Sequence, residues 1–216
     1  FIAVYWSAIA KVWLLVLANV LIAGVLVVLF INGNSWQQNL ENMLYSDEVV
    51  LRIDTKFQRI LLTKRAAADN DIYSLYLNGH TQFSSSDEHM YHALLVEPAM
   101  LVAARSKKIL IIGGGDGLAL RDVLRWQPDQ VTILELDQQM VELFSTEKYA
   151  DGELINQALL ELNQHAFSDS RVKVIYGDAF NSVQQLAENY YDVILVDLPD
   201  PNHPNLNKLY SVAFYH

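Results

Sequence analysis

Residues 108–124 read KILIIGGGDGLALRDVL, and this stretch decides the fold. Its first residues form a short apolar run typical of a buried strand, and the glycines that follow break the run in a tight turn. Apolar residues then recur at helical spacing, at Leu118, Leu120, Val123 and Leu124. The stretch therefore predicts a strand, a turn and a helix, which is the repeating unit of a parallel α/β sheet.

The same alternation continues along the chain. Apolar or β-branched runs at residues 131–136, 172–176 and 192–196 predict three more strands, with helical patterns between them. We therefore expect a parallel, doubly wound, Rossmann-like sheet. Because the chain stops at His216, soon after the fourth strand, we expect this sheet to be truncated at its C-terminus.

A small β-unit is predicted ahead of that sheet, over residues 48–86. Two aliphatic runs are followed by a hairpin whose turn is Asn78-Gly79, a pair that tolerates the positive φ angles of tight turns. The nucleoside-binding domain is then expected to occupy residues 87–216.

The N-terminal segment is strongly apolar. Val12 to Ile31 is a run of twenty residues with Asn19 as its only polar member. A helix of this length spans about 30 Å, the thickness of a bilayer core. We therefore expect a transmembrane helix over residues 1–32, with a buried core helix as the less favoured alternative for this segment. Residues 33–47 are expected to form a linker or a short helix.

Composition excludes several classes of site and partner. The 216 residues contain no cysteine, which excludes disulfide scaffolds, iron–sulfur clusters and thiol nucleophiles. Lys and Arg number 15 against 25 Asp and Glu, so we expect no nucleic-acid partner, because binding phosphates requires cations. The chain begins with Phe1 rather than Met, and we expect it to be a fragment.

The predicted strand ends carry glycines and acids that suit a nucleoside. Gly113, Gly115 and Gly117 let a ligand approach the backbone, and the helix that follows offers free N–H groups. Glu135 ends the next strand, 22 residues beyond Gly113, where a carboxylate typically accepts hydrogen bonds from ribose hydroxyls. Asp137 is the alternative for this role.

The end of the third strand completes the predicted adenosine site. Asp178 is placed to accept a hydrogen bond from an adenine amino group, and the N–H of Ala179 to bind a ring nitrogen. These residues do not separate a nicotinamide dinucleotide from S-adenosylmethionine or its relatives.

Further acids favour a cationic ligand. Asp116 in the glycine turn repels a pyrophosphate or a ligand carboxylate, and it suits the bare ammonium of decarboxylated S-adenosylmethionine. Asp197 and Asp200 flank Pro199 after the fourth strand, where they are expected to bind a diamine or take a proton from an amine nucleophile. A helix cap at Asp116 and a simple Asp-Pro turn are the competing interpretations.

One helix is expected to close the other side of this pocket. Ser85 and Glu88 have the spacing of a capping box, which starts a helix near Asp87. Tyr91 and His92 then lie in its first turns, where a structural role and a role in the pocket are equally favoured.

Several motifs in one order resemble the spermidine synthase (polyamine aminopropyltransferase) family. The stretches are FQRI, LYLNGHTQFSSSDE, YH, LIIGGGDGLALRDVL, LELD, RVKVIYGDAF, YDVILVDLPDP and LYSVAFY. The apolar N-terminus is similar to that of the family's membrane-attached bacterial branch.

The resemblance implies a methyltransferase-like sheet and transfer of an aminopropyl group from decarboxylated S-adenosylmethionine to a diamine such as putrescine, leaving methylthioadenosine. It implies no cofactor beyond this co-substrate, and no metal. It places the nucleoside at Gln58, Glu135, Asp178, Ala179 and Pro204. It places the aminopropyl ammonium of the donor at Asp116. The residues it implies for polyamine binding are His92, Asp116, Asp197 and Asp200. Asp197 matches the proton acceptor and Tyr91 its neighbour across the pocket.

Two positions depart from the family's pattern and keep alternatives open. Ala93 stands where the family usually has Glu, and Glu97 stands where the membrane branch tends to have His. An S-adenosylmethionine-dependent methyltransferase and a non-catalytic, membrane-coupled polyamine or nucleoside sensor are the alternatives. We expect the lipid bilayer as a partner, leave a homodimer open, and place the domain at the bacterial inner membrane facing the cytoplasm, where the donor is made.

Overall fold

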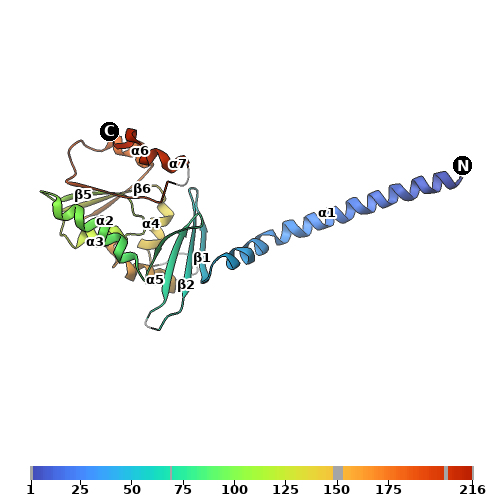
Figure 1. The fold of residues 1–216 in the computed structure, drawn as a ribbon, viewed down its shortest axis with the longest axis horizontal. Coiled ribbons are helices and arrows are strands. Elements are labelled where there is room, and N and C mark those ends of the chain that lie inside the picture. The colour runs from blue at the N-terminus through green and yellow to red at the C-terminus, as the bar shows by residue number, and fades with distance from the viewer. Residues whose placement is uncertain (1, 69, 148–152, 202–203, 216) are drawn as a thin grey trace. The chain divides into compact units, whose positions relative to one another are not determined.

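The computed structural model describes residues 2–68, 70–147, 153–201 and 204–215. The chain forms two compact units that divide after Glu48 (Figure 1). The first unit consists of one long helix, and the second contains two β-sheets with their helices.

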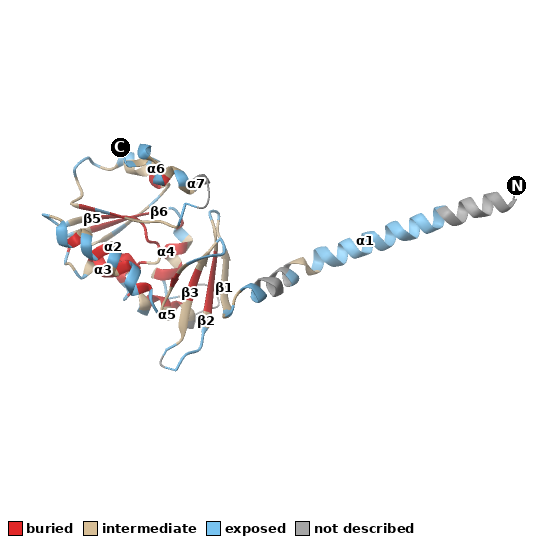
Figure 2. Cartoon of the chain, viewed as in Figure 1, coloured by how far each residue is buried: buried red, intermediate tan, exposed pale blue. Residues whose placement is uncertain are grey.

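Helix α1 (Ile2–Leu44) makes up the first unit. Its segment Val12–Gly33 is long and apolar enough to cross a membrane, a test that a signal sequence near an N-terminus also passes. Residues Val12 to Ile31 are all exposed and form the pale blue part of the helix in Figure 2. Residues 33–44 continue the helix without a break, which is the second of the two forms expected for this stretch, and no proline interrupts it.

The predicted β-unit is a four-stranded sheet in the order β1-β2-β3-β4. Its strands are β1 (Glu48–Asp54), β2 (Arg59–Arg65), β3 (Ile72–Leu77) and β4 (His80–Ser84). The expected hairpin joins β3 to β4, with positive φ angles of 51° at Asn78 and 84° at Gly79. A bulge between Leu75 and Tyr76 interrupts its register.

The second sheet is entirely parallel, as predicted, in the order β7-β6-β5-β8. Its strands are β5 (Lys108–Gly113), β6 (Gln130–Glu135), β7 (Val172–Tyr176) and β8 (Val193–Asp197). The longer helices that accompany them are α2 (Glu88–Val102), α3 (Leu118–Leu124), α4 (Gln138–Ser145) and α5 (Glu153–Leu162). Short helical segments complete the chain: η1 (Ala166–Ser168), α6 (Ala179–Ser182), η2 (Val183–Gln185), α7 (Pro204–Asn207), η3 (Lys208–Tyr210) and α8 (Val212–Tyr215).

Alternating side chains of β5 build the core on both faces of this sheet. Ile109 and Ile111 point to the face covered by α2 and α3, which lie side by side in Figure 1. Leu110 and Ile112 point to the opposite face and pack with residues of α6 and η3, among them the buried Leu209.

A third cluster joins the small sheet to helices that accompany the parallel sheet. Ile60, Leu62 and Phe83 of the small sheet pack against Phe144 of α4 and Leu159 of α5. The rings of Phe83 and Phe144 meet edge to face, with centroids 6.1 Å apart. The small sheet therefore packs against α4 and α5.

Candidate active site

The strand order places the candidate site. From β5 the chain moves outward through β6 and β7, and then returns to the other side of β5 for β8. The carboxyl ends of β5 and β8 therefore flank the topological switch point, where open α/β sheets bind ligands. The register pairs Gly113 with Asp197 at this position.

The glycine turn is fitted closely against the end of β8. Gly113 has φ +84°, and a Cβ there would lie 2.0 Å from the carbonyl oxygen of Asp197. The N–H of Gly114 donates to the same oxygen at 3.1 Å. At the other end of the turn Gly117, with φ +76°, is the left-handed residue directly before α3. These glycines are required by the fold itself, in addition to any ligand.

Four side chains gather here, from α2, from the β5–α3 turn and from β8; we call Tyr91, His92, Asp116 and Asp197 the polar cluster. A ring nitrogen of His92 and carboxylate oxygens of Asp116 and Asp197 all lie within 4.8 Å of one another. The hydroxyl of Tyr91 donates to Oδ1 of Asp197 at 3.0 Å. Asp116 also accepts the N–H of Leu118, the first residue of α3, at 2.9 Å, although the residue in the cap position is Gly117.

Burial and mutual repulsion perturb these groups. Burial and the charge of Asp116 raise the pKa of Asp197 to about 6. Burial likewise raises the pKa of Asp116, although the nearby His92 opposes this. Burial and the adjacent Asp197 raise the pKa of Tyr91, so its phenol stays protonated at neutral pH. The cluster thus combines two buried carboxyls of raised pKa with the hydrogen-bond donor Tyr91. A bound cation would stabilise the ionised form of both carboxyls, so the cluster suits the binding of cations.

Asp200 is not part of the polar cluster. It is exposed on the loop after β8, where the hydroxyl of Tyr210 donates to the backbone oxygens of Leu198 and Pro199 at 3.2 and 2.7 Å. Its role in binding a polyamine stays a prediction.

The two candidates for the ribose are separated by their hydrogen bonds. Asp137 is buried: its Oδ2 accepts from Thr55 at 2.7 Å and Gln58 at 3.0 Å, and its Oδ1 caps α4 through the N–H of Gln139 at 3.2 Å. Glu135 instead directs Oε2 to the glycine turn, 3.0 Å from where a Cβ on Gly115 would lie. Of the two acids, only Glu135 has a carboxylate oxygen directed at the glycine turn, and its role at the ribose stays a prediction.

The setting of Glu135 is itself unusual. Burial raises its pKa to about 7, although its Oε1 accepts the N–H groups of Leu136 and Asp137 at 2.8 and 2.9 Å. The amide of Gln58, predicted to contact the nucleoside, is used to fix the β1–β2 turn to Asp137.

Asp178 caps the short helix α6 through the N–H of Phe180, at 2.9 Å. Its other oxygen forms an ion pair with Lys208 of η3, a partner that sequence reasoning missed. Ala179 is buried behind it. Pro204 begins α7, and the position of its side chain lies outside the described part of the chain.

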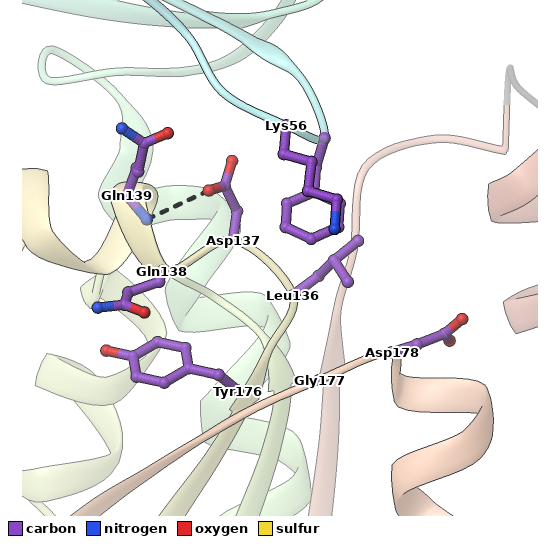
Figure 3. A pocket seen from close by; sticks show the side chains of 9 residues that line it. Lys56, Leu136, Asp137, Gln138, Gln139, Tyr176, Gly177 and Asp178 are labelled. Atoms are coloured by element: carbon purple, nitrogen blue, oxygen red, sulfur yellow. Dashed lines mark hydrogen bonds between the residues drawn. The ribbon is translucent and has the colours of Figure 1, made fainter.

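A cavity of about 570 Å³ opens between the ends of β6 and β7 and the β1–β2 turn (Figure 3). In Figure 3 Lys56 lies near Leu136 on one side, with Tyr176 and Asp178 on the β7 side. Its lining comprises Lys56, Phe57, Leu136, Asp137, Gln138, Gln139, Tyr176, Gly177 and Asp178. The cavity thus includes the adenine side of the predicted site but not the polar cluster.

The capping box predicted at Ser85 and Glu88 is wrong. The residue before α2 is Asp87, whose side chain makes no capping bond, and the hydroxyl of Ser85 accepts the N–H of Tyr73 at 3.0 Å. Glu88 is buried instead and binds Arg121 of α3. Nothing local marks this pair, since 33 residues separate its members.

Comparison with known proteins identifies the family of this chain. Residues 88–216 match the family model described as the spermine/spermidine synthase domain. A polyamine aminopropyltransferase of Shewanella oneidensis is 51% identical over 219 residues, covering 100% of this chain and 38% of the relative. One of Oceanobacillus iheyensis is 42% identical over 204 residues, covering 92% of this chain and 37% of the relative.

Solved structures agree as well. A spermidine synthase crystallised with the transition-state analogue AdoDATO is 28% identical with a TM-score of 0.65, covering 78% of this chain and 52% of that one. The spermidine synthase of Thermotoga maritima gives 28% identity and a TM-score of 0.58, covering 69% and 47%. This chain thus spans less than two fifths of the two curated relatives named here. Its parallel sheet has the methyltransferase-like fold of these enzymes, and the chain belongs to the spermine/spermidine synthase family.

Proposed function

We propose that this chain forms the reaction centre of a polyamine aminopropyltransferase. The donor is decarboxylated S-adenosylmethionine, the acceptor is a diamine such as putrescine, and the products are a spermidine-like polyamine and methylthioadenosine. The observation that carries the proposal is the polar cluster, which gathers Asp116 and Asp197 at the switch point of the sheet within 4.8 Å of His92.

The charges of the cluster fit these substrates. The aminopropyl tail of the donor ends in an ammonium, which Asp116 attracts, whereas the carboxylate of S-adenosylmethionine would be repelled. The acceptor also arrives as an ammonium, because an alkylamine has a pKa near that of lysine, about 10.4. A methyltransferase using the carboxylated donor is therefore not favoured.

Asp197 is placed to act as the general base. The acceptor nitrogen gives a proton to Asp197 and attacks the aminopropyl carbon; that carbon's bond to sulfur breaks, and its electron pair neutralises the sulfonium. The pKa of Asp197, raised to about 6 by burial and Asp116, brings the carboxylate closer to the basicity that proton transfer at neutral pH requires. Tyr91 occupies Oδ1, which leaves Oδ2 of Asp197 for the substrate.

The test uses the complete protein that contains this chain, incubated with labelled decarboxylated S-adenosylmethionine and a panel of diamines. We expect methylthioadenosine and aminopropylated product with at least one diamine. Asp197→Asn should lower kcat by about 10²–10⁴-fold, because the base is lost while the volume is kept. The matched control is Asp129→Asn, which changes an exposed aspartate at the opposite end of the sheet and should leave kcat unchanged.

Three outcomes contradict the proposal. Absence of product with every diamine would refute the reaction, and tighter binding of S-adenosylmethionine than of the decarboxylated donor would favour a methyltransferase. Binding without turnover that survives Asp197→Asn would favour a sensor.

We also propose that Val12–Gly33 anchors the enzyme in the bacterial inner membrane with the catalytic unit facing the cytoplasm. The length and apolar character of the segment support the anchor. The orientation is supported by the site of donor synthesis, because decarboxylated S-adenosylmethionine is made in the cytoplasm. A cytoplasm-active reporter fused to the C-terminus of the complete protein should be active, and activity only of a periplasmic reporter would overturn the orientation. A homodimer stays a prediction.

A further inference from the structure

A network of buried charges lies directly behind the polar cluster. Glu88, His92 and Arg121 have side chains only 5%, 3% and 6% exposed, and Asp122 is 9% exposed. We call Glu88, Arg121 and Asp122 the buried network. Burying charges costs several kcal/mol for each ion unless pairing offsets it, and such a group is weak evidence for a purely stabilising role.

Arg121 is saturated in this network. It forms a bidentate pair with Glu88, with Nη1 to Oε1 at 2.8 Å and Nη2 to Oε2 at 3.0 Å. Its Nε and Nη2 donate to Asp122 at 2.9 and 3.2 Å, and Nη1 also donates to the carbonyl oxygen of Leu162 at 2.9 Å. All five donors of the guanidinium are used, so its position is fixed.

Glu88, held by Arg121, in turn fixes the imidazole of His92, which lies one helical turn further along α2. The Nδ1 atom of His92 lies 2.9 Å from both Oε2 and the carbonyl oxygen of Glu88. His92 and Arg121 outweigh the effect of burial and lower the pKa of Glu88 to about 2, so its carboxylate is an obligatory acceptor. Nδ1 therefore carries the hydrogen, and Nε2 is the nitrogen left for the polar cluster.

The groups around His92 come from three elements. They are Glu88 and Tyr91 on α2, Asp116 and Arg121 on the β5–α3 segment, and Asp197 on β8. The Tyr91 ring contacts the imidazole edge to face, with centroids 5.0 Å apart. Burial disfavours the imidazolium, but Glu88, Asp116 and Asp197 outweigh it and raise the pKa of His92.

We propose that Arg121 and Glu88 are positioning residues that hold Nε2 of His92 toward the substrate amines, and that amine binding displaces a proton from Nε2 to solvent. In the empty site the imidazolium balances the two carboxylates. When a substrate ammonium enters, it takes over that role, and the neutral Nε2 accepts a hydrogen bond from it. The inference rests on the proposed function, because it assumes that amines bind at the polar cluster.

Calorimetry tests the proton release directly. Putrescine is titrated into the complete enzyme, saturated with methylthioadenosine, at neutral pH in two buffers that differ in ionisation enthalpy. We expect the binding heat to differ between the two buffers, because each bound amine releases a substantial fraction of one proton, which the buffer takes up. His92→Gln should abolish most of this difference. Equal heats in both buffers for the wild-type enzyme would overturn the proposal.

A pH profile tests the positioning role. In the wild-type enzyme kcat/KM for putrescine should rise with pH as Asp197 ionises, and rise further as His92 becomes neutral. Glu88→Gln keeps the shape of the side chain but removes its charge, so this rise should move to lower pH by about one unit or more. A purely structural role would lower activity without moving the inflection. Glu188→Gln removes the charge of an exposed glutamate in the turn before β8; it is the matched control and should leave the inflection in place.

The possible failures are distinguishable. A wild-type enzyme that yields no methylthioadenosine with any diamine refutes the proposed function. An active enzyme whose Glu88→Gln variant keeps the wild-type inflection refutes the positioning role. If Glu88→Gln does not fold, the calorimetry of the wild-type enzyme still decides whether amine binding releases the proton.

Discussion

Asp197 illustrates how the setting of one residue determines its chemistry. Burial and the neighbouring Asp116 raise its pKa to about 6, whereas the hydrogen bond from Tyr91 favours the ionised carboxylate. In the proposed role of general base Asp197 must be ionised, so activity should be lost as pH falls through this pKa. The position of that acidic limb therefore reports the balance of these contacts.

Tyr91→Phe should move the acidic limb of kcat to higher pH by up to about one unit. A hydrogen bond of ordinary strength contributes about 0.5–1.5 kcal/mol, and one pKa unit corresponds to about 1.4 kcal/mol. The measurement is kcat at saturating substrates across the acidic and neutral range. Tyr190→Phe, which removes a hydrogen bond to Gln130 at the amino end of the sheet, should leave the limb unmoved. A shift of the Tyr91 variant to lower pH would contradict this account.

Glu135→Gln should stabilise the fold at alkaline pH while weakening nucleoside binding. Burial raises the pKa of Glu135 to about 7, so its contribution to stability is fully present below the unfolded pKa and is lost as pH rises through 7. The variant should gain about 1–3 kcal/mol at pH 8 and little at pH 4. Denaturant unfolding at both pH values measures the gain.

The same variant should bind methylthioadenosine at least tenfold more weakly, because an amide is a poorer acceptor for two ribose hydroxyls. An identical gain in stability at both pH values would show that ionisation of Glu135 is not the cause.

Among the elements, the glycine turn joins β5, α3 and β8 into one unit. Gly113→Ala would place a Cβ 2.0 Å from the carbonyl oxygen of Asp197, which forces β8 away from β5. We expect a loss of about 3 kcal/mol or more in the free energy of unfolding, from overpacking added to backbone strain, together with loss of activity.

Gly79 provides a matched control for that change. It has the same φ of +84° in the β3–β4 turn, but a Cβ there would have nothing within 4 Å. Gly79→Ala should therefore cost only the backbone strain, about 1–2 kcal/mol, with activity retained. Equal losses for the two variants would show that close packing at Asp197 is unimportant.

For the whole molecule, the apolar segment of α1 makes a prediction about membrane association. Leu21→Arg places a charge near the middle of Val12–Gly33, where insertion costs about 2.5–3.5 kcal/mol more on translocon-based scales. The complete protein should shift toward the soluble fraction or lose abundance if this segment is its main anchor. Met43→Arg, on the same helix but outside the segment, should remain in the membrane fraction. Recovery of the wild type and of both variants in the soluble fraction would show that this segment is not an anchor.

Much of the fold could be predicted because it rests on local patterns. The period of the apolar residues marks the four parallel strands, Asn78-Gly79 marks the hairpin, and the glycines mark the turn after β5. The acids that carry the proposed chemistry were also found in this way, since Glu135 and Asp197 each end a strand. These features depend on a few consecutive residues and their backbone preferences.

The amino-acid sequence by itself determined the kinds of element, their order and the acidic ends of the strands. Only the tertiary structure decided which side chains meet. In the folded chain Asp137 accepts a hydrogen bond from Gln58, and the carboxylate of Glu135 lies at the glycine turn. Glu88 pairs with Arg121, and Asp178 pairs with Lys208. Periodicity reports which face of an element is buried, whereas contacts between distant residues depend on strand order and packing, which no local pattern encodes.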